Sequence, residues 1–183
     1  MRNRTYRYFT EDPLFPFGFG LSYSSFSYSD FAVTDREPTG TGATSPAAEE
    51  PNSGAKQSSR SEISGTAPVH VSACLANTSS IPGDEVVELY ISHPGAEGAP
   101  RCALVGFERV HLPAGGFQFV SFVLSPRELS IVDPNGNRLV PAGPVELWLG
   151  SGQPAAPLTK PTRPAPNGVA LKFTVTASTP LPH

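Results

Sequence analysis

The stretch Gly83-Asp-Glu-Val-Val-Glu-Leu-Tyr-Ile-Ser92 has the clearest strand pattern in the chain. Successive side chains along a strand point to opposite faces of the sheet. One face would carry Val87, Leu89 and Ile91, and the other would carry Val86, Glu88 and Tyr90. A period of two with one fully apolar face is typical of a strand with a buried side. We therefore expect residues 83–92 to form a central strand of an antiparallel sheet.

Six further segments show strand patterns. Turn-forming residues separate these segments, and helical periodicity is absent from them. The predicted strands cover residues 26–33, 69–75, 103–112, 117–124, 145–149 and 169–177. Ser125, followed by Pro and three residues later by Glu128, predicts one short helical turn. An Asn-Gly pair within residues 133–137 predicts a hairpin turn. Seven short strands with these connections favour an all-β, immunoglobulin-like sandwich of about seven antiparallel strands, preceded by an extended N-terminal segment.

Composition supports the all-β interpretation and excludes two classes of partner. The chain has 21 prolines and 17 glycines among 183 residues, which suits many turns. Its net charge is -3 and only 16% of its residues are charged, so we expect no nucleic-acid partner. No stretch is apolar over the 18 or so residues that a membrane span needs. The basic N-terminus is not followed by an apolar run, so the sequence as written predicts no secretory signal.

One long segment differs from the rest of the chain. Residues 34–67 contain no aromatic residue, and Ile63 is their only large aliphatic residue. A segment of this composition buries too little apolar surface to offset the entropy lost on ordering. We expect it to be a disordered insertion between two paired strands, which is tolerable because closure entropy grows slowly with loop length.

The cysteines, sequons and histidines give only weak signals. Cys74 and Cys102 are too few for a disulfide framework and wrongly spaced for a zinc site, so a single bridge and two free thiols remain the alternatives. Asn3 and Asn77 begin glycosylation sequons, which matter only in an exported chain. The histidines are scattered, and we expect neither a metal nor a cofactor.

Several stretches together resemble one enzyme family. Residues 4–9 and 13–26 are similar to the junction in glycoside hydrolase family 3 at which the second domain passes into a fibronectin type III-like domain. Residues 77–92 and 104–112 resemble motifs of that later domain. The resemblance implies that residues 1–23 are the tail of an α/β-sandwich domain with its junction loop. Residues 24–177 would then be a fibronectin type III-like domain, and residues 178–183 a C-terminal tail.

Three shorter segments, residues 114–116, 120–125 and 150–154, favour the β-xylosidase-like branch of the family over the β-glucosidases. The resemblance also implies an absence of catalytic residues. In this family the nucleophile lies in an N-terminal barrel and the acid/base in the following domain, and neither region has a counterpart here. The adjacent acids Asp84 and Glu85 would point to opposite faces of a strand, so they do not form the carboxylate pair that glycoside hydrolysis requires.

The aromatic residues away from the predicted core are candidate interface residues. They comprise Phe15, Phe17, Phe19, Tyr23, Phe117, Phe119 and Trp148. The loop containing the first four has no evident partner within the sandwich, and an exposed apolar patch usually marks an interface. We expect contact with the catalytic domains of a parent glycosidase, with independent binding of polysaccharide as the alternative. Members of the family are typically secreted.

Overall fold

The computed structural model describes residues 5–9, 13, 15, 17–20, 22–35, 59–154 and 166–182. Seven strands of eight residues or more form the body: β1 (Phe26–Thr34), β3 (Val69–Asn77), β4 (Gly83–Ser92), β5 (Ala103–Leu112), β6 (Phe117–Leu124), β9 (Gly143–Gly150) and β10 (Gly168–Val175). All seven predicted strands are present. The expected sandwich is confirmed.

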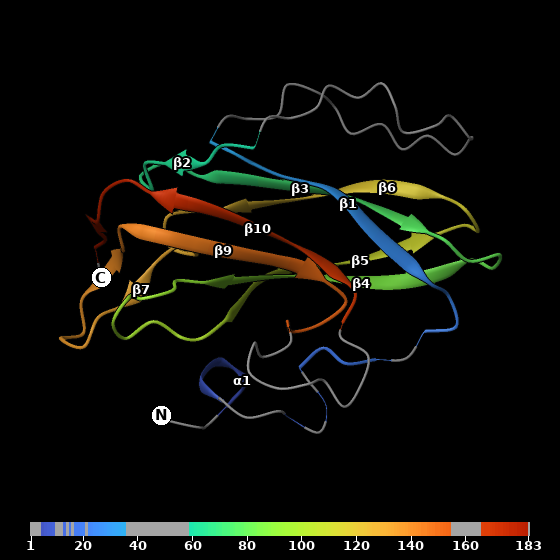
Figure 1. Cartoon of the computed structure of the whole chain (residues 1–183), viewed down its shortest axis with the longest axis horizontal. Coiled ribbons are helices and arrows are strands. Elements are labelled where there is room, and N and C mark those ends of the chain that lie inside the picture. The colour runs from blue at the N-terminus through green and yellow to red at the C-terminus, as the bar shows by residue number, and fades with distance from the viewer. Residues whose placement is uncertain are drawn as a thin grey trace.

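The long strands form two layers (Figure 1). Sheet A has the order β1-β3-β6, and sheet B has the order β2-β10-β9-β4-β5. All pairs among the seven long strands are antiparallel, and β4 lies between β9 and β5 as expected of a central strand. The two faces that meet between the layers therefore define the core.

Four shorter strands and one helical turn complete the structure. They are α1 (Thr5–Tyr8), β2 (Glu62–Ile63), β7 (Ile131–Val132), β8 (Arg138–Val140) and β11 (Thr179–Pro180). A small third sheet has the order β11-β8-β7, and the predicted hairpin turn joins β7 to β8. Gly136 has the positive φ, 89°, that this turn requires.

Three expectations about irregular segments were wrong in part. The N-terminal residues were expected to be extended, but Thr5–Tyr8 forms a helical turn. The segment 34–67 was expected to be disordered, yet β2 pairs in parallel with β10 and Ile63 is buried in the core. Residues 36–58 of that segment lie outside the described residues. The supposed C-terminal tail contributes β11, which pairs with β8.

The core is formed by the inward positions that the strand patterns predict. On β4 these are Val87, Leu89 and Ile91, each at most 3% exposed. On the facing β3 the inward set is Val69, Val71, Ala73 and Leu75, all fully buried. Burying a Val, Leu or Ile side chain contributes about 1.5–3 kcal/mol, so these two strands supply a large share of the apolar stabilisation.

The segment after β6 forms a turn but no helix. The backbone N–H of Ser125 donates to the carboxylate of Glu128 at 2.8 Å, and the N–H of Arg127 donates to the Ser125 hydroxyl at 3.2 Å. This is the expected capping arrangement. The chain leaves it after one hydrogen-bonded turn, because Leu129 is fully buried and β7 begins two residues later.

Two ionisable groups lie buried near β4. The hydroxyl of Tyr28 donates to Glu85 at 2.6 Å, and burial raises the pKa of the Glu85 carboxyl. His93 follows β4 and is only 6% exposed, and neither ring nitrogen has a hydrogen-bond partner in the described part of the chain. Burial lowers the pKa of His93 from 6.5 to about 4. The folded chain therefore holds His93 in its neutral form.

The burial of His93 predicts a pH-dependent loss of stability. Below pH 6.5 the unfolded chain protonates this residue, while the folded chain resists protonation until about pH 4. The free energy of unfolding should fall through this window by up to about 3 kcal/mol more in the natural chain than in His93→Leu. Urea unfolding of both proteins at several pH values between 7.5 and 4 measures the difference. Parallel pH curves would contradict the assignment.

Candidate functional site

An N-terminal segment, defined by residues 5–9, 13, 15 and 17–20, packs on the outer face of sheet B (Figure 1). The ring of Tyr6 stacks on Phe17 with centroids 4.6 Å apart, and it meets Tyr90 edge-on at 6.3 Å. The Tyr6 hydroxyl accepts a hydrogen bond of 3.2 Å from the backbone N–H of Leu104. Tyr90 is consequently 1% exposed although it points away from the core. Strand β4 is thus covered on both faces at Glu88 and Tyr90.

Gln153 holds two parts of this segment together. Its side-chain amide donates to the carbonyl of Tyr6 at 3.4 Å and accepts from the N–H of Phe17 at 3.4 Å. Its backbone N–H also donates to the Phe17 carbonyl at 2.9 Å. Gln153 is 6% exposed, so these bonds are shielded from water. A buried side chain therefore fixes the N-terminal segment to the end of β9.

A second attachment lies beside the first, at the start of β5. The backbone N–H of Arg101 donates to the carbonyl of Arg7 at 2.8 Å. The Arg101 guanidinium donates to the carbonyl of Phe9 at 2.6 Å. Both partners lie at or just after the last residues of α1, whose carbonyls have no partner within such a short helix. Arg101 therefore satisfies the end of α1 and ties it to sheet B.

Beneath the segment lies a buried carboxylate. The hydroxyl of Tyr90 donates to Glu88 at 2.6 Å, and Glu88 is 8% exposed. Burial, followed by the bond to Glu88, raises the pKa of Tyr90. Gly18 has φ 78° and lies so close to the Glu88 carboxylate that a Cβ atom would collide with it. Glycine is needed there for both its conformation and its size.

Five exposed apolar side chains surround this buried pair and are called the aromatic patch: Phe15, Phe17, Phe19, Val86 and Phe107, which are 40–71% exposed. The rings of Phe15 and Phe19 lie 5.2 Å apart. Phe107 is the cross-strand neighbour of Glu88, and Val86 precedes Glu88 on the same face of β4. The patch therefore joins the loop to β4 and to the edge strand β5 of sheet B.

The structure separates the interface residues expected from sequence into groups. Phe15, Phe17 and Phe19 join the aromatic patch, but their loop was wrongly expected to have no partner within the sandwich, because Gln153 bonds to the backbone of Phe17. Tyr23 is fully exposed. Phe117 and Phe119 lie on β6 in sheet A, and Phe119 is 53% exposed.

Trp148 does not present a free binding face. Its indole N–H donates to the carbonyl of Gly152 at 2.9 Å, and its ring lies close to Gly150 and Gly168. The side chain is half-buried and pairs across strands with Tyr90. Trp148 therefore supports the end of β9 that carries Gln153.

Phe107 and Val86 were missed by the sequence interpretation. The signal that could have identified Phe107 is its place opposite Glu88 once the pairing of β4 with β5 is known. Within β5 the alternation is interrupted by a register irregularity between Leu89 and Tyr90 on the partner strand. Pattern alone therefore did not assign Phe107 to a face.

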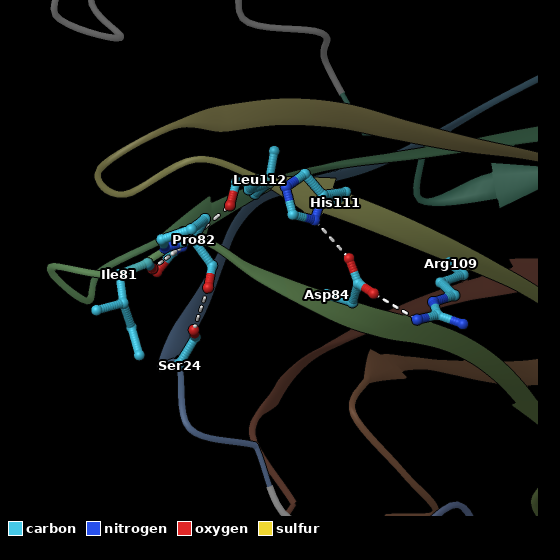
Figure 2. A network of polar contacts seen from close by, with 8 residues as sticks. Ser24, Ile81, Pro82, Asp84, Arg109, His111 and Leu112 are labelled. Carbon is cyan, nitrogen blue, oxygen red and sulfur yellow. Dashed lines mark hydrogen bonds and ion pairs between the residues drawn. The ribbon is translucent and has the colours of Figure 1, made fainter.

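The acids on β4 do not form a catalytic pair. Glu85 points towards the core and is bonded by Tyr28, whereas Glu88 points outward and is bonded by Tyr90. Figure 2 shows Asp84 between Arg109 and His111, with His111 Nδ1 2.5 Å from an Asp84 oxygen. The bonds from Arg109 and then His111 lower the pKa of Asp84. This cluster pins β5 to β4 at the surface.

The two cysteines are free and buried, so the disulfide alternative was wrong. Cys74 is on β3 of sheet A, while Cys102 directly precedes β5 of sheet B. Burial raises the pKa of both thiols. Among the described residues, no group of three or more His, Cys, Asp or Glu side chains could hold a metal ion. Within the same ranges, no helix is long and apolar enough to cross a membrane.

The side chain of Asn77, the first residue of a sequon, stabilises a turn through its hydrogen bonds. Its side-chain amide donates to the carbonyl of Ile81 at 2.9 Å and to that of Leu112 at 3.3 Å, and its oxygen accepts from the N–H of Ser79. Asn77 is 2% exposed. Ser24 closes the same turn by donating to the carbonyl of Pro82 at 3.1 Å (Figure 2). Asn3, the other sequon residue, lies outside the described residues.

Comparisons with known proteins identify related sequences and folds. Residues 85–153 match the family "Fibronectin type III-like domain". The chain is 38% identical over 150 residues to "Probable beta-glucosidase D" of Aspergillus niger, covering 80% of this chain and 19% of that protein. It is 30% identical over 151 residues to a "Beta-xylosidase" of Formosa agariphila, covering 82% of this chain and 17% of that protein.

Solved structures agree with these sequence relationships. A β-glucosidase of Kluyveromyces marxianus aligns with a TM-score of 0.65 at 25% identity, covering 96% of this chain and 17% of that chain. β-Glucosidase 3B of Thermotoga neapolitana aligns with a TM-score of 0.67 over 96% of this chain and 20% of its own, and at 24% identity it supports the fold alone. The chain spans about a fifth of the length of the relatives it matches.

The attachment by Gln153 predicts local opening on mutation. Gln153→Ala removes the side-chain hydrogen bonds to Tyr6 and Phe17, worth about 0.5–1.5 kcal/mol each, together with a weaker one to the Cys102 sulfur, and leaves the body of the sandwich unchanged. Amide hydrogen exchange should accelerate about fivefold or more at residues 6–9 and 17–20, with β3 unaffected. Ser151→Ala is the matched control on the same loop. Unchanged exchange in Gln153→Ala would contradict the role assigned to this side chain.

The burial of Asn77 predicts that its sequon carries no glycan in the folded chain. Asn77→Asp would set a carboxylate against two carbonyl oxygens and should lower the free energy of unfolding by about 2 kcal/mol or more. Ser79→Ala, which also removes the sequon, should cost less because it loses only turn contacts. Urea unfolding compares the variants, and peptide mapping after secretion from a eukaryotic host examines Asn77. A glycan on Asn77 in folded monomer would refute the prediction.

Proposed function

Because the chain contains a fibronectin type III-like domain of the kind found in glycoside hydrolase family 3 enzymes, we propose that it is the non-catalytic C-terminal support of such a glycosidase. The parent activity would be hydrolysis of O-glycosyl bonds in β-glucosides or in xylan and arabinan. The support acts in cis, by holding the polypeptide that leads to the catalytic domains. In this proposal the chain supports and contacts the catalytic domains, and it catalyses no reaction itself.

The N-terminal segment packed on sheet B is the observation that carries the proposal. Its sequence resembles the junction between the second domain and the sandwich, and Gln153 and Arg101 fix it at two points. An incoming chain attached in this way cannot swing freely, because it is held at two points and Tyr6 packs against the buried ring of Tyr90. The sandwich would therefore set the position of whatever precedes the junction.

The acids of the strand beneath the segment also favour a non-catalytic role. Glycoside hydrolysis requires two carboxyl groups that face the same bond. Glu85 and Glu88 lie on opposite faces of β4, and each is already bonded by a tyrosine hydroxyl. The acidic residues Asp84 and Asp133 instead accept hydrogen bonds within surface turns and strand pairs. None of these arrangements presents a free acid and base to a sugar.

A replacement experiment tests the proposal. Deleting the matching fifth of "Probable beta-glucosidase D" of Aspergillus niger should abolish or strongly reduce its activity, and fusing this chain in its place should restore it. The isolated chain should hydrolyse neither aryl β-glucosides nor aryl β-xylosides. Activity on both substrates is followed by release of nitrophenol.

Two outcomes would contradict the support role. One is hydrolysis by the isolated chain that disappears when one of its own acids is replaced. The other is an inactive fusion whose sandwich is folded, as judged by a cooperative melting transition matching that of the isolated chain. A second fusion with the fibronectin type III-like region of the Kluyveromyces marxianus enzyme serves as the control for the replacement itself.

A further inference from the structure

We propose that the aromatic patch on the outer face of sheet B is the surface that docks onto the catalytic portion of the parent glycosidase. The proposal rests on the proposed function and adds to it the specific face of the sandwich. It assigns Val86 and Phe107 to the interface, and it excludes the β6 aromatics Phe117 and Phe119. The occupant is the folded body of the upstream domains, held in cis.

The patch is continuous with a contact that already exists inside the chain. Phe17 is half of the stacked pair with Tyr6, yet 46% of its surface remains exposed. Next to it Gly18 abuts Glu88, whose cross-strand neighbour is Phe107 at 71% exposure. Apolar side chains therefore extend from the buried junction to Phe107 on β5 and Val86 on β4, and the ion pair of Arg109 with Asp84 borders them at Val86. A domain joined to the junction segment would therefore lie next to this surface.

The chemistry of the patch favours a protein surface over a sugar. Sugar sites combine an aromatic platform with polar groups that bond to the ring hydroxyls. Here Glu88 is buried and bonded by Tyr90, and Arg109 is occupied by Asp84. The four exposed rings are all phenylalanine, which offers no hydrogen bond. Phenylalanine clusters surrounded by satisfied polar groups are characteristic of the apolar centre of a protein interface.

The opposite outer face provides a contrast. On sheet A, Phe119 and Val123 are 53% and 60% exposed, but Ser121 separates them along β6. Their cross-strand neighbours are Cys74 and His70. No second segment of the described chain packs on this face and extends it. Phe119 and Val123 are exposed to a similar extent as Phe107 and Val86, so they serve as a matched control on the other face.

The test uses the fusion with the Aspergillus niger catalytic portion. Val86→Ser with Phe107→Ser should shorten the half-life of activity at elevated temperature by about tenfold or more, because two apolar anchors leave the interface. In calorimetry the fusion should change from one joint transition to two separate transitions. Phe119→Ser with Val123→Ser should leave both measurements unchanged. The same substitutions in the isolated chain should not lower its melting temperature, since the replaced side chains are exposed.

The outcomes are distinguishable from failure of the support role itself. An active, singly melting fusion that tolerates Val86→Ser with Phe107→Ser would overturn the patch and leave the support role standing. Equal damage from the sheet A control pair would also overturn it. The isolated chain is also titrated with xylo- and gluco-oligosaccharides. Saturable sugar binding that is lost in Phe107→Ser would show that the patch binds sugar, and it would overturn the proposal. An inactive fusion with a folded sandwich would instead refute the support role on which this proposal depends.

Discussion

The burial of Tyr90 on the side of β4 away from the core determines the form of the whole N-terminal region. A tyrosine hydroxyl removed from water needs an acceptor, and Glu88 supplies it at 2.6 Å. Glu88 is then itself buried, and Gly18 must approach it closely, which requires a residue without a side chain. The ring of Tyr6 then packs edge-on against the ring of Tyr90. One aromatic side chain thus makes the junction segment part of the sandwich.

Much of the fold could be predicted from the sequence because strand patterns are local. The alternation in residues 83–92 and the inward set on β3 both follow directly from a period of two. The second burial of β4 could not be predicted in this way. Tyr90 and Glu88 are residues that an exposed face also carries. Their burial depends on the packed segment, in which Gly18 lies 70 positions before Glu88 and Tyr6 lies 84 positions before Tyr90. The same holds for Ile63, whose strand exists only because β10 lies beside it.

The candidate sites read from short motifs show the same limitation. Two cysteines on or beside strands suggest a disulfide, but both are free, with Cys74 on β3 of sheet A and Cys102 directly before β5 of sheet B. A sequon marks Asn77 as an acceptor, but the turn before β4 uses both ends of its amide. A motif specifies which chemistry a residue could perform. Burial and hydrogen bonding then determine whether its atoms are free to perform it, and these depend on the fold.

The two outer faces of the sandwich differ in a way that bears on how a small patch can act. Both faces carry exposed apolar side chains, but Phe119 and Val123 on sheet A lie apart from the junction, whereas sheet B presents Phe107 beside it. Five side chains are far fewer than the 20–30 residues that each side of a stable independent complex contributes. A partner joined through the same polypeptide needs less, because a short tether makes its local concentration millimolar or higher. The fixed junction and the small patch therefore suit each other: the first supplies proximity and direction, and the second needs to supply only specificity.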